Sequence, residues 1–400
     1  MVPNGWRHLK LPEFAWFQEG PGLRKWQFTD SGCKVINITN IVNGYLDLAK
    51  TERHISEEEL NAKYKHFLCN AGDIVIASSG NSYCKHGIVR EQDLPLVMNT
   101  SVIRFKPLDN CDYEFLNQFL KSKYLKQQID VLITGGAQPN FGPAHLKQIE
   151  LNLPPINEQR IIAKVLSTWD KAITTTEKLI ATSKQQKKAL MQQLLTGKKR
   201  LVNPKTGKAF EGVWEDKKLK QCVAFQNGRR KPIKQEERAN IQGEIPYYGA
   251  TGIIDYVNDH IFDEKLILLG EDGENILSRV LPHVFVIQGK TWVNNHAHVL
   301  KANSDIDTDF LCIYLESLDY RKYNSGSAQP KINKAVCEKI PVKLPSLQEQ
   351  QKIASVLTTA DKEIEVLEAK LAHFKQEKKA LMQQLLTGKR RVKVDEAEAA

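Results

Sequence analysis

KKALMQQLLTGKKR, at residues 187–200, returns almost unchanged as KKALMQQLLTGKRR at residues 378–391. An ungapped alignment extends the match back to LPPINEQRIIAKVLSTWDK at 153–171 and LPSLQEQQKIASVLTTADK at 344–362. About 29 of roughly 48 aligned positions are identical, far more than shared helical composition would give. The chain is therefore an internal repeat, in which each half is a variable region followed by a nearly constant helix.

The repeat reaches further towards the start of each half. The same register places GGAQPNF (135–141) on GSAQPKI (326–332). A weaker match joins NGWRHLKL (4–11) to GVWEDKKL (212–219). The variable regions are thus related to each other, although most of their residues have diverged.

Apolar residues recur in alternating steps of three and four along both copies of the helix, which is the pattern of a coiled-coil seam. The seam consists of Ile162, Leu166, Trp169, Ile173, Ile180, Leu190 and Leu194 in the first copy and of Ile353, Leu357, Ala360, Ile364, Leu367, Leu371, Phe374, Leu381 and Leu385 in the second. Either the helices pair with each other, or each packs on its own globular region. The presence of two matched helices favours pairing. Because a globular region precedes each helix, antiparallel pairing would place the two regions at opposite ends of a rod, related by a pseudo-twofold axis.

Both helices have recognisable ends. Ser346 and Glu349 form a capping-box pattern at the start of the second helix, and Asn157 is a candidate N-cap of the first. Gly197 and Gly388 stand where a left-handed residue commonly ends a helix. Roughly 40 residues between these signals predict helices about 60 Å long.

The globular regions have a mixed α/β (α+β) pattern. β-branched runs predict strands at 33–41, 72–78, 100–105, 265–270 and 283–288, and 113–129 has a helical pattern. We expect the following segments: a globular domain at 1–152, a helix at 153–197, a basic linker at 198–212, a second globular domain at 213–343, a second helix at 344–391 and a tail at 392–400.

Length and composition narrow the class of protein. A chain of 400 residues suits two or three domains. It contains no uncharged apolar run long enough for a membrane span and no apolar signal-peptide core, so we expect a cytoplasmic protein. Seven cysteines without a CxxC pair predict reduced structural thiols. The net charge of +10 favours a polyanionic partner without identifying it.

No motif for catalysis is complete. Neither TGKKR nor PKTGKAF has the first glycine and the terminal hydroxyl of a Walker loop, and no GxGxxG follows a strand, so we expect no bound cofactor. NLPPIN at 152–157 lacks the Asn-Pro-Pro-aromatic motif of amino methyltransferases. His283, His296 and His298 have no cysteine or carboxylate at ligand spacing, so we expect no metal. EDGE at 271–274 is typical of a tight acidic turn.

The repeated LPxxxEQxxIAxVL and KKALMQQLLTGK, with INITNIVNGY and GDIVIASSGNS in the first half and PYYGATGIIDYV and LLGEDGENI in the second, resemble the specificity subunit of type I restriction-modification systems. The resemblance covers nearly the whole chain. It implies a non-catalytic protein with two target-recognition domains, each of which reads one half of an asymmetric, bipartite DNA sequence. The helices would set the spacing and dock two methyltransferase subunits, and restriction subunits would supply motor and nuclease activity.

The residues agree with this resemblance. Two dissimilar globular regions on paired helices suit the reading of two dissimilar half-sites, and nearly identical helices offer two equivalent docking surfaces to one type of partner. A different class of function remains open, namely a coiled-coil scaffold whose globular regions bind proteins. The missing motifs argue against a free-standing DNA enzyme.

Several polar residues are candidates for contact with DNA. Ser78, Ser79, Asn81 and Ser82 follow a predicted strand and offer amide and hydroxyl groups to base edges, although a plain β-turn also explains them. The cluster of Arg229, Arg230 and Lys231 is either a phosphate-binding site or a solvated patch.

The AQP motifs provide a second set of candidates. Gln138 and Gln329 occupy equivalent positions, so they suit a phosphate contact or a structural hydrogen bond rather than base reading. The halves differ after the proline, where Asn140 aligns with Lys331, and these residues are better candidates for sequence preference. Glu271 and Asp272 are expected to stabilise a turn, since carboxylates near phosphates would usually repel.

Overall fold

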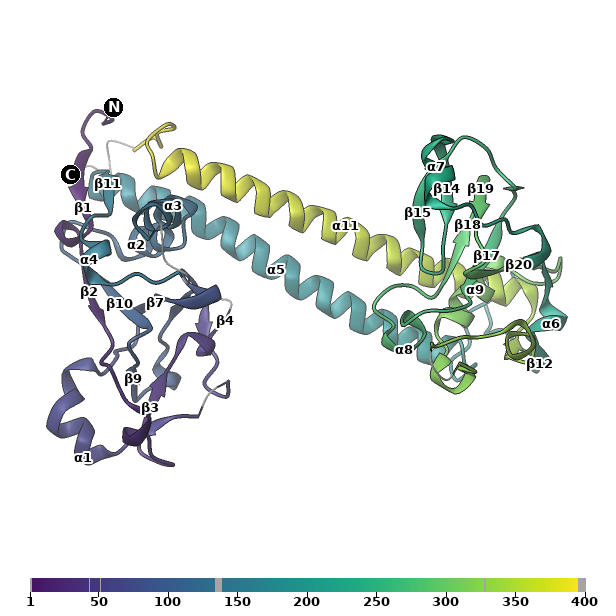
Figure 1. The fold of residues 1–400 in the computed structure, drawn as a ribbon, viewed down its shortest axis with the longest axis horizontal. Coiled ribbons are helices and arrows are strands. Elements are labelled where there is room, and N and C mark those ends of the chain that lie inside the picture. Colours follow the sequence, from purple (N-terminus) through teal and green to yellow (C-terminus); the bar gives the residue numbers. More distant parts are fainter. Residues whose placement is uncertain (1, 43, 51, 134–138, 327–328, 395–400) are drawn as a thin grey trace. The chain divides into compact units, whose positions relative to one another are not determined.

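The computed structural model describes residues 2–42, 44–50, 52–133, 139–326 and 329–394 (Figure 1). The chain divides into two compact units, Met1–Glu177 with Ala369–Ala400, and Lys178–Glu368. Each unit contains one globular region, the first part of one long helix and the last part of the other. We call the globular regions domain 1 (residues 1–152) and domain 2 (residues 213–343). Both mix helices and strands, as the sequence predicted.

Domain 1 is built on a four-stranded antiparallel sheet, in the order β2 (Ala15–Glu19), β10 (Val102–Pro107), β7 (Ile74–Ala77) and β8 (His86–Ile88). The central strand β7 reads IVIA and is buried along its length. Its alternate side chains enter two hydrophobic clusters, one of them shared with the helices α2 (Tyr113–Leu120) and α3 (Lys123–Leu132). The expected single helix at 113–129 is therefore two helices. The break occurs because Ser122 caps α3, accepting a hydrogen bond from the N–H of Leu125 at 3.1 Å.

Smaller sheets complete domain 1. They are the antiparallel pair β1 (Arg7–Lys10) and β11 (Glu150–Leu153), the sheet β6 (His54–Ile55), β3 (Cys33–Ile36) and β9 (Leu96–Met98), and the pair β4 (Ile41–Val42) and β5 (Tyr45–Leu46). In the second of these, β3 and β9 run parallel. The short helix α4 (Pro143–Leu146) leads into β11.

Domain 2 repeats this plan with different residues. Its main sheet is antiparallel, in the order β13 (Val223–Phe225), β20 (Ala297–Ala302), β17 (Leu266–Gly270) and β18 (Val284–Ile287). Alternate side chains of β17 again enter two clusters, one of them shared with α9 (Thr308–Glu316). The other elements of the plan are the pair β12 (Glu215–Lys218) and β21 (Pro341–Leu344), the sheet β15 (Ile253–Val257), β14 (Gln242–Tyr248), β19 (Lys290–Val293) and β16 (Phe262–Asp263), and the helix α10 (Lys334–Cys337).

The repeated segments form two 39-residue helices, α5 (Ile156–Leu194) and α11 (Leu347–Leu385). Gly197 and Gly388 follow them with φ of +71° and +70°, so both predicted glycine ends are confirmed. Ser346 Oγ accepts from the N–H of Glu349 at 3.4 Å, which is half of a capping box. The expected cap at Asn157 is wrong, because α5 begins at Ile156 and Asn157 lies within its first turn. No helix among the described residues has the length and apolar character needed to cross a membrane.

The two helices are antiparallel where they meet inside each unit. In the first unit Lys378 pairs with Asp170 at 2.6 Å, and Lys375 pairs with Glu177 at 2.8 Å. In the second unit Lys184 pairs with Glu368 at 2.6 Å, and Lys187 pairs with Asp361. Higher numbers on one helix thus meet lower numbers on the other. Because the two sets are equivalent in the repeat, the same side chains hold both contacts.

The segment 198–212 is folded rather than extended. An antiparallel bridge joins Val202 to Ala209, and the turn between them is closed by a hydrogen bond from the Gly207 N–H to the Asn203 carbonyl at 2.9 Å. Phe210 is buried, and its backbone N–H donates to the Leu201 carbonyl. The segment is therefore a small hairpin that is held in place by the buried Phe210 side chain.

Candidate functional site

Two loops meet at the end of the central strand of domain 1. The loop after β7 begins with Ser78, Ser79 and Gly80, and the second loop contains Pro139 and Asn140. The Gly80 N–H donates to the Pro139 carbonyl at 2.9 Å, the Phe141 N–H donates to the Ser78 carbonyl at 3.0 Å, and Ser79 and Asn140 form an antiparallel bridge. The structure therefore brings together two sets of candidates that the sequence presented separately.

Domain 2 contains the same backbone arrangement. The Gly273 N–H donates to the Pro330 carbonyl at 3.0 Å, the Ile332 N–H donates to the Glu271 carbonyl at 2.8 Å, and Asp272 is bridged to Lys331. Glu271 and Asp272 thus stand where domain 1 has Ser78 and Ser79. The sequence predicts a candidate contact at the serine loop and only a turn at the acidic loop. It does not reveal that the two loops are equivalent, because the chain between the paired loops differs in length between the halves.

The side chains of the domain 1 loops differ in accessibility. Asn81 and Asn140 are exposed, whereas Ser79 and Ser82 are half-buried. Ser78 is only 1% exposed, so its hydroxyl does not face solvent. The loop is tied to α3 by Tyr83, whose hydroxyl donates to Asp130 at 2.6 Å. Gln138 lies outside the described residues.

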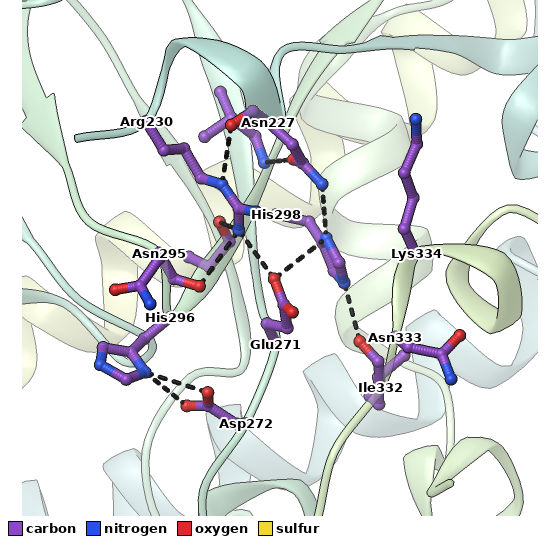
Figure 2. Close-up of polar contacts among 12 residues, drawn as sticks. Asn227, Arg230, Glu271, Asp272, Asn295, His296, His298, Ile332, Asn333 and Lys334 are labelled. Atoms are coloured by element: carbon purple, nitrogen blue, oxygen red, sulfur yellow. Dashed lines mark hydrogen bonds and ion pairs between the residues drawn. The ribbon is translucent and has the colours of Figure 1, made fainter. Parts of the chain in front are cut away.

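In domain 2 the bridge rests on a charged network around Glu271 (Figure 2). Arg230 donates to the Glu271 carboxylate at 2.7 Å and to the backbone carbonyl of Ala297 at 2.8 Å. The Lys331 ammonium lies 3.4 Å from the other Glu271 oxygen. The Glu271 side chain is 14% exposed. Burial by itself would raise the pKa of this carboxyl, but the hydrogen bond from Arg230 and the neighbouring positive charge lower it below its usual value.

His298 lies within this network, between Asn227 and Ile332, and His296 lies to one side beside Asp272 (Figure 2). Nε2 of the buried His298 ring lies 2.8 Å from the Ile332 carbonyl, and the Asn227 amide lies 2.9 Å from Nδ1. Because a carbonyl only accepts, Nε2 carries the proton. Burial lowers the pKa of His298, so the ring is neutral near pH 7. His296 is exposed, with Nδ1 2.9 Å from Asp272. Across the described residues, no group of three or more His, Cys, Asp or Glu side chains is placed to hold a metal.

The structure separates the members of the basic cluster. Arg229 donates to Glu264 at 2.7 Å and lies over the Phe262 ring at 4.4 Å, whereas Arg230 is bound to Glu271. Lys231 is exposed, with its ammonium 5.8 Å from the Trp292 ring centroid. The two guanidinium groups are thus already engaged with carboxylates.

The second loop of domain 2 is fixed by short-range hydrogen bonds. Asn324 Oδ1 accepts from the N–H of Gly326 at 3.0 Å and from the N–H of Lys331 at 2.9 Å. The Ser325 N–H donates to the Lys331 carbonyl at 2.8 Å. Gln329 is exposed. Lys331 therefore has a fixed backbone and a half-exposed side chain.

The repeated Glu-Gln pair of the LPxxxEQ motif has a structural role that the sequence did not suggest. Glu158 is 2% exposed and accepts from Trp6 Nε1 at 2.9 Å and from Arg391 at 2.6 and 2.7 Å. Glu349 is buried in the same way and accepts two hydrogen bonds from Arg200, both at 2.6 Å. Each pair joins the start of one helix to the residues that follow the other.

The glutamine of the motif joins each helix to its domain. Gln159 Oε1 accepts from the N–H of Asp112 at 2.7 Å, and Asp112 is the N-cap of α2. Gln350 accepts from the N–H of Asp307, the N-cap of α9, at 2.9 Å. The sequence signal for these roles is that the glutamate and the glutamine recur at the same positions in both copies of the motif.

The predicted pairing residues occupy buried or half-buried positions. They are Ile162, Leu166, Ile173, Leu190, Leu194, Ile353, Leu357, Ile364, Leu371, Leu381 and Leu385. Those near the helix ends belong to the domain cores. Ile162 and Leu166 pack with Leu385 in the domain 1 cluster, and the equivalent residues pack with Leu194 in domain 2.

Matching surface hollows lie beside the last turns of the helices. The hollow in the first unit has a volume of about 350 Å³ and is lined partly by Lys379, Met382 and Gln383. The hollow in the second unit has a volume of about 470 Å³ and is lined by the equivalent Lys188, Met191 and Gln192. The repeat therefore presents the same side chains at two places.

A family model described as the type I restriction modification DNA specificity domain matches residues 3–185 and again residues 211–376. The MjaVIII specificity subunit of Methanocaldococcus jannaschii is 26% identical, and the alignment covers 98% of this chain and 94% of that protein. A putative type I specificity subunit of Haemophilus influenzae is 34% identical over 36% of each chain. The solved S subunit of Mycoplasma genitalium has the same fold, with a TM-score of 0.62 at 18% identity, covering 96% of this chain and 98% of that chain.

Proposed function

Because the chain belongs to the type I restriction-modification DNA specificity family, we propose that it is the sequence-recognition subunit of such a complex, in which each domain reads one half of a bipartite, asymmetric DNA target. The observation that carries the proposal is the pair of equivalent loop bridges. Their backbone is the same, whereas Ser79 and Asn140 in one domain become Asp272 and Lys331 in the other. A constant backbone with different side chains suits the reading of two different sequences.

The candidate contacts divide by chemistry. Ser79, Asn81, Ser82 and Asn140 offer hydroxyl and amide groups to base edges. The buried hydroxyl of Ser78 makes it a supporting residue instead. Among the basic residues, the exposed Lys231 is the best candidate for a phosphate contact. Arg229 and Arg230 would have to share their guanidinium groups with Glu264 and Glu271.

Residues that are identical in both domains suit DNA contacts that do not depend on the base sequence. Gln138 and Gln329 are the same residue in both motifs, so we assign them to the phosphates or to loop structure. A residue common to both domains cannot distinguish the two half-sites.

The helices would set the spacing of the half-sites and dock two methyltransferase subunits, and restriction subunits would join the full complex. The two equivalent hollows beside Met191 and Met382 support two docking places for one type of partner. In this assignment the chain itself is non-catalytic, and its partners carry out methyl transfer and cleavage.

An exchange of domains tests the assignment. The chain would be co-expressed with its modification subunit, and methylated adenines would be mapped by sequencing. The native chain should give one bipartite motif. Replacement of residues 1–152 by the corresponding region of a relative should change only one half of that motif, because each domain has its own core. Changes in both halves would contradict independent reading, and the absence of any bipartite motif would contradict the function.

A further inference from the structure

The exposed residue of each loop bridge has a distinctive setting. Asn140 and Lys331 each follow a proline whose carbonyl is hydrogen-bonded, and each precedes a buried apolar residue, Phe141 or Ile332. Because successive side chains of an extended chain point to opposite sides, anchoring Phe141 and Ile332 in the cores turns the preceding side chain outwards. We propose that Asn140 and Lys331 are the equivalent base-reading side chains, that Asn140 suits adenine and Lys331 suits guanine, and that Glu271 positions Lys331.

The base assignment follows from the hydrogen-bonding groups. A lysine ammonium has only donors, and guanine presents two acceptors, O6 and N7, in the major groove. An asparagine amide has both a donor and an acceptor, which match N7 and N6 of adenine. The domain 1 half-site would therefore contain an A·T pair at the position where the domain 2 half-site contains a G·C pair. This inference rests on the proposed function and names the chemistry that each domain reads.

Glu271 explains why a lysine suits this position in domain 2 and an asparagine suits it in domain 1. Its carboxylate is turned inwards, where Arg230 holds one oxygen at 2.7 Å, and the other oxygen lies 3.4 Å from the Lys331 ammonium. A flexible lysine gains a preferred direction from such an anchor. In domain 1 the equivalent residue is the buried Ser78, which carries no charge. The neutral amide of Asn140 needs no ionic anchor.

The main test replaces Lys331 with the residue of domain 1. In the assembled methyltransferase complex, Lys331→Asn should lower the preference for G·C at one position of one half-site by about tenfold or more, towards A·T. The other half-site should not change. Lys334→Asn is the matched control, because Lys334 is an exposed lysine three residues further along the chain, and its ammonium lies over the Phe225 ring at 5.5 Å. It should weaken binding without changing the motif.

The positioning role of Glu271 can be tested by a separate measurement. Glu271→Gln keeps an acceptor for Arg230 but removes the charge that holds Lys331, so it should relax the same G·C position while the rest of the motif stays intact. A merely structural role would instead reduce methylation equally at all sites.

An unchanged motif in an active Lys331→Asn complex would overturn the proposal, as would changes in both half-sites. If that variant does not assemble, Asn140→Ala decides the question, because it should lower the preference for A·T at one position of the other half-site by about tenfold. An unchanged motif there would also overturn the proposal. Failure of the proposed function itself would look different, since the native chain would then direct no bipartite methylation.

Discussion

His283 is a buried imidazole in domain 2. Its side chain is 1% exposed, neither ring nitrogen has a partner among the described atoms, and the ring packs against Tyr320 with centroids 4.6 Å apart. Burial and the nearby positive charge of Arg279 lower the pKa of His283 to about 3. The folded domain therefore holds this ring in its neutral form.

We expect this histidine to make the protein sensitive to acid. An unfolded histidine has a pKa near 6.5, so the unfolded chain binds more protons, and stability is lost as the pH falls from about 6.5 towards 3. Between pH 7 and pH 5 the loss from this group should be about 2 kcal/mol. Urea unfolding across this range would measure it. His283→Leu should reduce the pH dependence without abolishing it, because the pKa of His86 is also lowered, to about 4. An unchanged pH dependence would refute the prediction.

The Glu158 carboxylate is a second buried group, and it depends on a partner from the end of the chain. Removing the charge of Arg391 by Arg391→Met should destabilise the first unit by about 1–3 kcal/mol, because a buried acceptor loses its charged donor. Thermal unfolding would detect the change. The double variant Glu158→Met with Arg391→Met should lose less stability than the sum of the two single variants, because the interaction between the two residues is lost only once. Simple additivity of the two losses would show that the pair is not coupled.

Each long helix packs both on its own domain and on the other helix, so both packing alternatives are confirmed. The first turns of α5 pack into domain 1 through Ile162 and Leu166, and the middle of the helix faces α11, where Trp169 meets Phe374 with ring centroids 5.6 Å apart. Lys378 and Lys187 interrupt the seam, and they pair with Asp170 and Asp361 of the other helix. The apolar stripe of each helix therefore packs into the domain cores near the helix ends and against the other helix in between.

Charges placed in this stripe should separate the helices. Leu371→Glu together with Leu381→Glu would bury two carboxylates at half-buried positions of the first unit, at a cost of several kcal/mol. We expect loss of helix pairing by circular dichroism and release of methyltransferase subunits in size-exclusion chromatography. Ala372→Glu with Ala380→Glu is the control, because both alanines are exposed on the same helix. A seam variant that assembles as fully as this control would show that pairing lies elsewhere.

At the scale of the whole molecule, the repeat gives each unit the same set of connections. A buried glutamate accepts from an arginine that follows the other helix, a glutamine holds a helix N-cap, and two lysines reach across the helix pair. Because the second copy supplies the arginine, glutamine and lysine partners again, two divergent domains keep one type of attachment.

The proposed spacer role of the helices predicts a measurable change in the DNA target. Seven residues inserted in each helix, opposite one another, would preserve the heptad register and lengthen the pair by about 10 Å. If the helices lie along the duplex, the unread spacer should grow by about three base pairs. Both half-site sequences should stay the same, because the recognition loops are untouched. The extra base pairs also rotate one half-site relative to the other, so activity should fall.

Genome-wide mapping of methylated sites would measure the spacer of the inserted variant. An active variant with the native spacer would disprove the spacer role. Altered half-site letters would show that the helices influence reading directly.

Part of the candidate site could be predicted from the sequence. The AQP motifs align without gaps, so Asn140 and Lys331 could be paired and recognised as a difference between the halves. The serine loop stood out because small polar residues follow a buried strand. The acidic loop did not stand out, because its charges suggest a turn and its equivalence to the serine loop appears only when the strands β7 and β17 are superposed in topology.

The sequence alone determined the repeat, the two helices, their glycine ends and their seam, because periodicity and end signals are properties of neighbouring residues. Only the tertiary structure decided that Ser79 meets Asn140, that Asp272 meets Lys331, and that Glu158 accepts from Arg391. These partners lie far apart in the chain. They are selected by the packing of strands and helices around the shared cores, and no local preference of the residues encodes that choice.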